Sequence, residues 1–376
     1  MPDPIILSAS PTGRIAEIIL HFTPNWFAAS MGTGILAVAL GQFPASPLLH
    51  GAGQALYLAN TGLFLLLASA YALKWVLHPH LAARLFAHPV QSMFLGTIPM
   101  ALATIINATL MYGPALYGET AATGLATTLW FVDAMLALAV GIGVPFLMFT
   151  RQSHAIGDMS AVWLLPVVAA EVAAASGLLL SPHLADPQAA LTTLAVCIVL
   201  WACSVPLALS ILVILFLRMV LYKLPPAAMA ATSWLALGPI GTGALGLALI
   251  ALNGPQALNA SGLGTLAQPL TGAALLGALA LWGYGVWWLA TALLVTLRQM
   301  RLGLPFNLGW WAYTFPLGVY ALATLKIGAI LPLGLFPVAG AGMVCLLVVI
   351  WLVVAARTVA GAINGRLFND PCIAIA

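Results

Sequence analysis

Hydrophobic residues in this chain form long unbroken runs separated by short polar gaps. A helix that crosses a bilayer needs about 20 mostly apolar residues, whereas a strand of a membrane barrel alternates in hydrophobicity over about ten residues. We mark ten unbroken runs, at residues 24–42, 52–77, 92–112, 122–150, 161–181, 189–217, 228–252, 268–297, 308–330 and 335–362. The pattern predicts an all-α polytopic membrane protein with ten transmembrane helices.

The polar gaps carry their Lys and Arg residues in alternation. Ten of the 11 Lys and Arg residues obey this rule: Arg14, Lys74, Arg84, Arg151, Arg218, Lys223, Arg298, Arg301, Arg357 and Arg366. The intervening gaps contain neither residue type, and Lys326 lies inside a run. Because Lys and Arg are retained in cytoplasmic loops, we expect both termini in the cytoplasm. The expected organisation is an N-terminal segment 1–23, a transport domain 24–362 and a C-terminal tail 363–376.

Composition restricts the class of protein further. With 63% hydrophobic and 5% charged residues, the chain is not typical of a water-soluble domain. The net charge of +3 follows from the topology and indicates no nucleic-acid partner. The first 20 residues lack an apolar core followed by a cleavage site, so we expect no signal peptide. The cysteines, at positions 197, 203, 345 and 372, lack the spacing of a metal site or disulfide framework.

Proline and glycine recur in the odd-numbered runs, which begin roughly 70 residues apart. Four of these runs carry a proline in or near the cytoplasmic half, and the first has a Gly-x-Gly there. An interior proline bends a helix, and the carbonyl it frees must be satisfied by protein or by a hydrated cavity. We therefore predict five parallel hairpins in a ring, with bent odd helices inside and even helices outside. The expected lumen-shaping residues are Gly32, Gly34, Gly241, Pro99, Pro166, Pro239 and Pro316. The alternative is that both residue types are simply common in membrane helices.

Four sets of residues carry a resemblance to a known family: 22–27 with 31–34, 88–89 with 94–99, 163–166, and 310–316. They resemble the tellurite-resistance/dicarboxylate transporter family, which includes plant slow-type anion channels, fungal malate permeases and fungal sulfite pumps. The resemblance spans residues 22–360. It implies ten helices in five tandem hairpins, a pore in each protomer, a homotrimer, and anion movement without ATP or a cofactor. It also implies a pore-closing phenylalanine on the ninth helix. Phe315 matches that position, with Phe306 and Tyr313 as alternative registers.

Lys326 follows Phe315 by 11 residues, close to three helical turns, so both side chains share one helix face. The rise between them is about 16 Å. A lone ammonium in the outer half of a pore would attract anions and repel cations. Lys326 could equally extend to the lipid headgroups, because it lies near the end of its run.

Two carboxyl groups lie inside the runs, Glu171 in the fifth and Asp133 in the fourth. Such groups usually face a cavity or a partner. For Glu171 we keep a pore-lining or proton-coupling role and a structural hydrogen bond as alternatives. For Asp133 we favour a structural role. His78, His80 and His88 form a loop cluster that lacks metal-site geometry, so we expect no metal, and we expect no cofactor.

The expected function is transport of a small anion across a bacterial inner membrane. C4-dicarboxylates such as malate are the first candidates, followed by sulfite. A permissive chloride or nitrate channel and proton-coupled sulfite efflux remain alternatives. No P-loop is present, which argues against ATP-driven transport, and we expect no enzymatic activity. A membrane-embedded enzyme or haem protein is the remote alternative, because most histidines lie near run ends or in loops.

Overall fold

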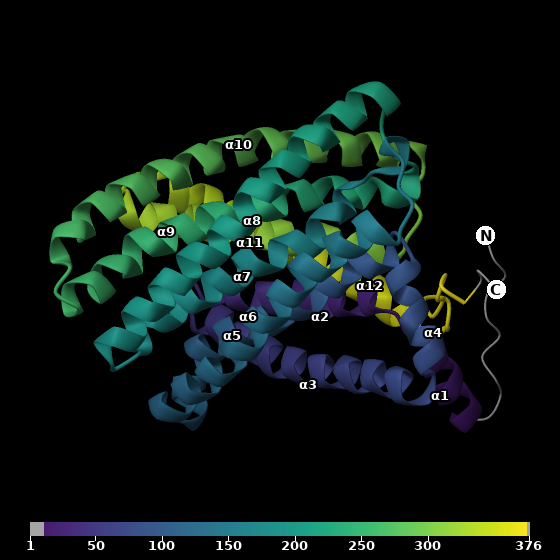
Figure 1. The fold of residues 1–376 in the computed structure, drawn as a ribbon, viewed down its shortest axis with the longest axis horizontal. Helices are drawn as coiled ribbons and strands as arrows, with labels where there is room; N and C mark the ends of the chain where they lie inside the picture. The colour runs from purple at the N-terminus through teal and green to yellow at the C-terminus, as the bar shows by residue number, and fades with distance from the viewer. Residues whose placement is uncertain (1–10, 374–376) are drawn as a thin grey trace.

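The computed structural model describes residues 11–373, and these form helices with no strand among them. Five helices form an inner layer: α2 (Phe27–Leu40), α5 (Thr97–Tyr117), α7 (Leu164–Leu180), α9 (Leu237–Ala260) and α11 (Phe315–Ile330). Five longer helices form an outer layer: α3 (Pro47–Leu77), α6 (Glu119–Thr150), α8 (Pro187–Tyr222), α10 (Ala267–Leu302) and α12 (Leu335–Ile363). Two short helices, α1 (Pro11–Leu20) and α4 (Pro79–Ala83), lie at one end of the bundle (Figure 1).

The two layers differ sharply in burial. In the inner spans that contain α5, α7, α9 and α11, between 72% and 89% of the most apolar window is buried. In the five outer helices this share is 17–33%. The outer helices therefore present apolar side chains to lipid, and the inner helices are enclosed by protein. This confirms the predicted all-α membrane fold.

Nine spans in the described chain are long and apolar enough to cross a membrane. The tenth expected span, the first, is shorter: a 3-residue 3₁₀ segment, η1 (Pro24–Trp26), followed by the 14 residues of α2. These 17 residues rise roughly 27 Å, just under the thickness of the hydrocarbon core. Even so, α2 packs in the inner layer, against α5 on one side and α11 on the other.

The inner helices form a closed ring in chain order. α2 contacts α5, α5 contacts α7, α7 contacts α9, α9 contacts α11, and α11 returns to α2. Each outer helix rests on two consecutive inner helices, as α6 does on α5 and α7. This arrangement is the ring of five hairpins that the alternating runs predict.

The four prolines expected to bend the inner spans, Pro99, Pro166, Pro239 and Pro316, lie in the first turn of their α-helices and not in the interior, which corrects one expectation. In each of these four spans a 3₁₀ helix comes first, and the α-helix begins one or two residues before the proline. We call Pro99, Pro166, Pro239 and Pro316 the junction prolines. Proline is tolerated in the first turn of an α-helix, where its missing N–H has no intrahelical role. The chain therefore changes helix type at these positions instead of kinking a continuous α-helix.

The 3₁₀ segments themselves form a second, smaller ring. They are η1, η3 (Gln91–Gly96), η5 (Ala161–Trp163), η7 (Ala227–Ala236) and η9 (Leu308–Tyr313), and each contacts the next, with η9 returning to η1. Shorter 3₁₀ turns occur in the connections: η2 (Arg84–Ala87), η4 (Ile156–Asp158), η6 (Ser181–His183) and η8 (Gly264–Leu266). The ring lies at the end of the bundle where the outer helices finish, which is also the end that carries the ten alternating Lys and Arg residues.

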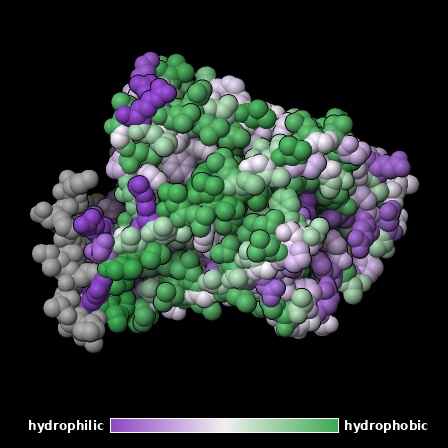
Figure 2. Space-filling view, turned by 180° about the vertical axis from the view of Figure 1, so that it is seen from behind, coloured by the Kyte–Doolittle hydropathy of each residue, from purple (hydrophilic) through white to green (hydrophobic). Residues whose placement is uncertain are grey.

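The surface has the pattern expected of a membrane-embedded bundle. Figure 2 shows hydrophobic side chains spread over the middle of the molecule, with hydrophilic side chains gathered toward its ends. Fifty-two large hydrophobic side chains of the described chain are exposed. Contact with lipid accounts for such a surface without a soluble partner.

An aromatic hydrogen-bond donor recurs in every outer helix and binds the next inner helix. Three of these bonds are Trp130 Nε1 to Ala173 O (2.9 Å), Trp201 Nε1 to Gly243 O (3.0 Å) and Trp282 Nε1 to Thr324 Oγ1 (2.9 Å). Trp351 Nε1 bonds Thr33 Oγ1 (3.0 Å), and the Tyr57 hydroxyl bonds Thr109 Oγ1 (3.0 Å). These five aromatics recur roughly every 70–80 residues. The hydrogen bond between an outer-helix aromatic and the next inner helix is therefore a second repeat of the chain, which the proline pattern did not indicate.

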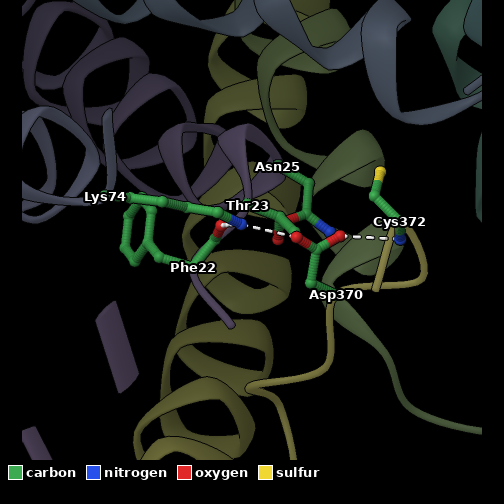
Figure 3. Close-up of polar contacts among 6 residues, drawn as sticks. All are labelled: Phe22, Thr23, Asn25, Lys74, Asp370 and Cys372. Carbon is green, nitrogen blue, oxygen red and sulfur yellow. Dashed lines mark hydrogen bonds and ion pairs between the residues drawn. The ribbon is translucent and has the colours of Figure 1, made fainter. Parts of the chain in front are cut away.

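The last described residues close the ring between the first and last hairpins (Figure 3). Lys74, at the end of α3, is buried and binds Asp370 Oδ2 (2.5 Å) and Phe22 O (2.7 Å). The other carboxylate oxygen of Asp370 accepts from Cys372 N (2.8 Å). Segment 364–373 is thus packed against the start of the first inner span.

Candidate functional site

The ninth span contains the inner helix α11, which carries the predicted gate residue. The contacts of α11 define which way each side of this helix faces. On one side Gly318 lies against Ile35 of α2, so close that a Cβ there would overlap it. On another side Gly241 of α9 approaches the α11 backbone, because a Cβ on this glycine would lie 2.9 Å from Tyr320 N. These two sides point to the inner neighbours of α11.

The outward sides of α11 are equally well defined. Trp282 of α10 donates to Thr324, and Leu325 packs against Gly340 of α12. At 3.6 residues per turn, one row of side chains falls between the α2 and α9 sides and away from both outer helices. That row faces the ring axis, and its members are Phe315, Val319, Leu322 and Lys326.

Phe315 begins α11 directly after the 3₁₀ segment and is only 3% exposed. The two alternative residues lie elsewhere. Phe306 packs against Trp310 (5.3 Å between ring centroids) and lies under the Arg357 guanidinium of α12 (6.0 Å). Tyr313 packs edge-on against Trp234 (5.4 Å). Both therefore belong to packing around the 3₁₀ ring, and Phe315 has the axis-facing geometry. Its gating role stays a prediction.

Lys326 shares the row of Phe315, as their 11-residue spacing predicts, and is half-buried. Among residues 11–373, the ion pairs are Lys74 with Asp370 and His183 with Glu119, so Lys326 has no carboxylate within 4.0 Å. It is also the one Lys, Arg or His in the five inner α-helices as described. An unpaired ammonium at this place can attract an anion along the axis.

The predicted lumen glycines allow neighbouring helices to approach closely. Gly32 lies against Trp311 and Thr314 of the ninth span, and Gly34 lies against Thr104 of α5 and Asn60 of α3. In both cases a Cβ would overlap a neighbouring side chain. Gly241 makes the same kind of contact with α11. The three glycines therefore set the spacing of the ring, and direct lining of a lumen stays a prediction.

Threonine hydroxyls satisfy carbonyls where the helix type changes. Thr97 Oγ1 donates to Phe94 O and Thr314 Oγ1 donates to Trp311 O, both at 2.7 Å. In each case the acceptor lies three residues back, as in a 3₁₀ turn. Long 3₁₀ stretches are unusual and often mark a hinge. The six residues of η9 are separated from Phe315 by Thr314 alone, so a change of helix type there would move the Phe315 side chain.

Glu171 is fully buried, and its position on α7 points away from the axis. Glu171 lies on the same face of α7 as Val167, which is four residues before it, and Leu178, which is seven residues after it. Val167 O accepts from Ser204 of α8 and Leu178 O accepts from Asn253 of α9, both at 2.8 Å. These contacts indicate that this face of α7, and the Glu171 side chain with it, is directed to the seam between α8 and α9. The expected pore-lining role of Glu171 stays untested.

The loop histidines lie apart from this pathway. Among the described residues no group of three or more His, Cys, Asp or Glu side chains is arranged to hold a metal. His88 Nδ1 accepts from Val90 N (3.2 Å) and Gln91 N (3.1 Å), and burial lowers the pKa of His88. His88 therefore caps the start of η3 as a neutral side chain. The four cysteines are free thiols.

The whole ring of helices lies within a region that is similar to known proteins. Residues 21–359 match the family described as voltage-dependent anion channel. The chain belongs to this family. The match covers nine of the inner and outer helices entirely and α12 as far as residue 359, and it confirms the family resemblance. The family consists of channels and transporters, which supports anion transport by this chain.

Its relatives include proteins named for the transport of two different anions. A sulfite efflux pump of Arthroderma otae is 38% identical over 93% of both chains. An uncharacterized transporter of Methanocaldococcus jannaschii is 31% identical over 94% of this chain and 98% of the relative. A malic acid transport protein of Schizosaccharomyces pombe is 22% identical over 96% of this chain and 82% of the relative. The sulfite efflux pump is thus more similar to this chain than the malic acid transport protein is.

Proposed function

We propose that the chain moves small anions, with sulfite as the first substrate, along the axis enclosed by its five inner helices. The observation that carries this proposal is the axis-facing row of α11. That row combines a bulky apolar side chain, Phe315, with an unpaired ammonium, Lys326. An apolar constriction closes a pore by excluding water, and a single cation beyond it favours anions over cations.

The proposed pathway has one charge, and this favours a small oxyanion. A dicarboxylate such as malate would favour two or more cations at its two ends, because each carboxylate needs a partner when it leaves water. Lys326 is the single candidate in the inner α-helices as described. The similarity to sulfite efflux pumps supports the same choice.

Other features of the proposal follow from the fold and the family. The inner glycines and junction prolines shape the pathway, and transport requires no ATP, cofactor or chemical conversion of the anion. We propose a homotrimer in the cell membrane, with both termini in the cytoplasm. The alternating Lys and Arg residues support this orientation, and a bacterial inner membrane is the expected location.

Flux measurements in proteoliposomes test the proposal directly. Purified protein is reconstituted, and efflux of sulfite, malate and chloride is followed with and without a pH gradient, against protein-free vesicles. We expect sulfite to leave faster than malate in protein-containing vesicles. Faster malate efflux would favour the dicarboxylate alternative, and no protein-dependent flux of any anion would overturn the proposal.

A further inference from the structure

Two carboxyl groups in the middle of the bundle have no partner. Asp133 on α6 and Glu171 on α7 are both 0% exposed, and neither oxygen of either group has a hydrogen-bond partner among the described residues. Other carboxylates differ: Asp370 binds Lys74, Glu119 binds His183, and Asp186 caps α8. Within residues 11–373 Asp158 also has no side-chain partner, but it is exposed to water. Among the described carboxyl groups, burial without a partner is therefore confined to the two inside the membrane region.

The two carboxyl groups lie at the same depth on neighbouring antiparallel helices. Trp130 of α6 bonds Ala173 O of α7 at 2.9 Å. Further along, a Cβ on Gly141 of α6 would lie 3.3 Å from Pro166 O of α7. Between these two points the register sets Asp133 level with Glu171. Glu171 is also the eighth of the 17 residues of α7, close to its centre.

Both groups occupy positions that the other repeats fill with uncharged residues. The residue three places after each outer aromatic donor is buried in all five repeats, as Asn60, Asp133, Ser204, Gly285 and Val354. The residue five places after each junction proline is likewise buried, as Thr104, Glu171, Ala244 and Ala321. The surroundings at both positions therefore suit uncharged side chains.

An ionised carboxylate in such surroundings would lack both water and a counter-charge, which is very costly. We propose that Asp133 on α6 and Glu171 on α7 are two separate proton-binding positions of the transport cycle, at one depth in the bundle. Each holds a proton in the described arrangement and exchanges it with water when the inner helices move. This inference rests on the proposed anion transport and adds a coupled ion to it.

The surrounding elements offer no other charge that could hold these groups ionised. The titratable or charged residues on elements packed against α6 and α7 are Tyr112 and Tyr117 on α5, Glu119 on α6, Cys197, Cys203, Arg218 and Tyr222 on α8, Arg84 on η2, and His183 on η6. α9, η3, η5 and η7 carry none. Arg218 is committed to Gly157 O (2.8 Å) and Lys223 O (2.6 Å) at the far end of α8.

The proposed step is a simple proton exchange. When a carboxyl group reaches water, its O–H bond breaks, the proton passes to a water molecule, and a carboxylate remains. The group must take a proton back from water before it can return to its buried position. If the two faces of the membrane supply and accept these protons, each cycle moves protons together with the anion.

Infrared spectroscopy of the reconstituted protein tests the protonation state without any transport. A protonated carboxyl has a C=O stretch that a carboxylate lacks. We expect this band at neutral pH, with partial loss in Asp133→Asn and in Glu171→Gln. Glu119→Gln, on the same helix as Asp133 but exposed to water at its end, is the matched control and should leave the band unchanged. Absence of the band in the unaltered protein would overturn the proposal.

Proton movement during transport tests the coupling. Vesicles with a lumenal pH dye receive a sulfite gradient at alkaline pH, where sulfite is ionised and does not leak through lipid. We expect sulfite-driven proton movement in the unaltered protein, and fewer protons moved per sulfite in Glu171→Gln and in the double variant Asp133→Asn/Glu171→Gln. Anion flux without proton movement in the unaltered protein would refute the coupling alone. No anion flux at all would instead refute the proposed function. Thermal unfolding identifies any variant that does not fold, and the single variants then carry the test.

Discussion

At the scale of single residues, α11 combines two opposite chemistries on one face. Phe315 excludes water where the 3₁₀ segment ends, and Lys326 offers a positive charge three turns further along. The sequence could relate these two residues because helical spacing is regular. It could not show which way the face points, since that depends on Ile35 and Gly241 in helices far apart in the chain.

Removing the proposed gate should increase flux. We expect Phe315→Ala to raise anion conductance about tenfold, which corresponds to about 1.4 kcal/mol off the barrier. Single-channel recording or vesicle efflux measures the change. Phe306→Ala is the control, because Phe306 packs beside Arg357 and not on the axis. Unchanged conductance in a folded Phe315→Ala protein would sink the gating role.

Removing the charge should act on selectivity. Lys326→Gln is expected to lower anion-over-cation selectivity. The decrease in selectivity should be largest at low ionic strength, where a fixed charge is least screened. Reversal potentials in a salt gradient measure this. Lys326→Arg keeps the charge and should keep the selectivity. A Lys326→Gln protein with unaltered selectivity at low salt would favour a headgroup anchor.

At the scale of helices, each inner span is two helices joined near a proline. The sequence predicted that the prolines recur at one depth of the inner spans, but it also suggested that they kink continuous α-helices. It could not distinguish a kink from a change of helix type, because both relieve the same missing N–H. The aromatic donors of the outer helices went unnoticed for a related reason. A tryptophan in an apolar run looks like a lipid or core residue until its acceptor, such as Thr324, is known.

The interlayer hydrogen bonds should contribute measurably to stability. Trp282→Phe removes the donor to Thr324 and keeps most of the ring, so we expect a loss of about 0.6–1 kcal/mol. Thermal unfolding in detergent measures it. Trp287→Phe is the matched control on the same helix, because Trp287 is 47% exposed. Equal unfolding temperatures for both variants would show that the donor is unimportant.

At the scale of the whole molecule, the ring is closed by residues from the two ends of the sequence. Lys74 and Asp370 form a buried ion pair, and Trp26 stacks on Phe368 with ring centroids 4.8 Å apart. The hairpin repeat and the family resemblance predicted the ring, because both extend along the helices. They did not predict its closure, because Lys74 looks like an ordinary topological charge and the family match ends at residue 359.

Breaking this ion pair should loosen segment 364–373. Lys74→Met leaves the Asp370 carboxylate buried and unpaired, which costs about 3 kcal/mol or more. Cys372 is a built-in reporter, because burial, more than the nearby Asp370, raises the pKa of its thiol to about 12 and slows alkylation. We expect faster maleimide labelling of Cys372 in Lys74→Met, in a background lacking the other cysteines. Lys74→Met combined with Asp370→Leu should restore slow labelling. Equal rates in the unaltered protein and in Lys74→Met would contradict this account of the pair.

The same pair has a consequence for how the protein is made. Its two residues are 296 positions apart, and a chain leaves the ribosome from its N-terminus. The first inner helix, α2, must enter the membrane without α11 and α12, two of its eventual neighbours. The ion pair that joins the first and last hairpins therefore forms only after residue 370 has been made. Until then Lys74 lacks the counter-charge that it has in the folded protein.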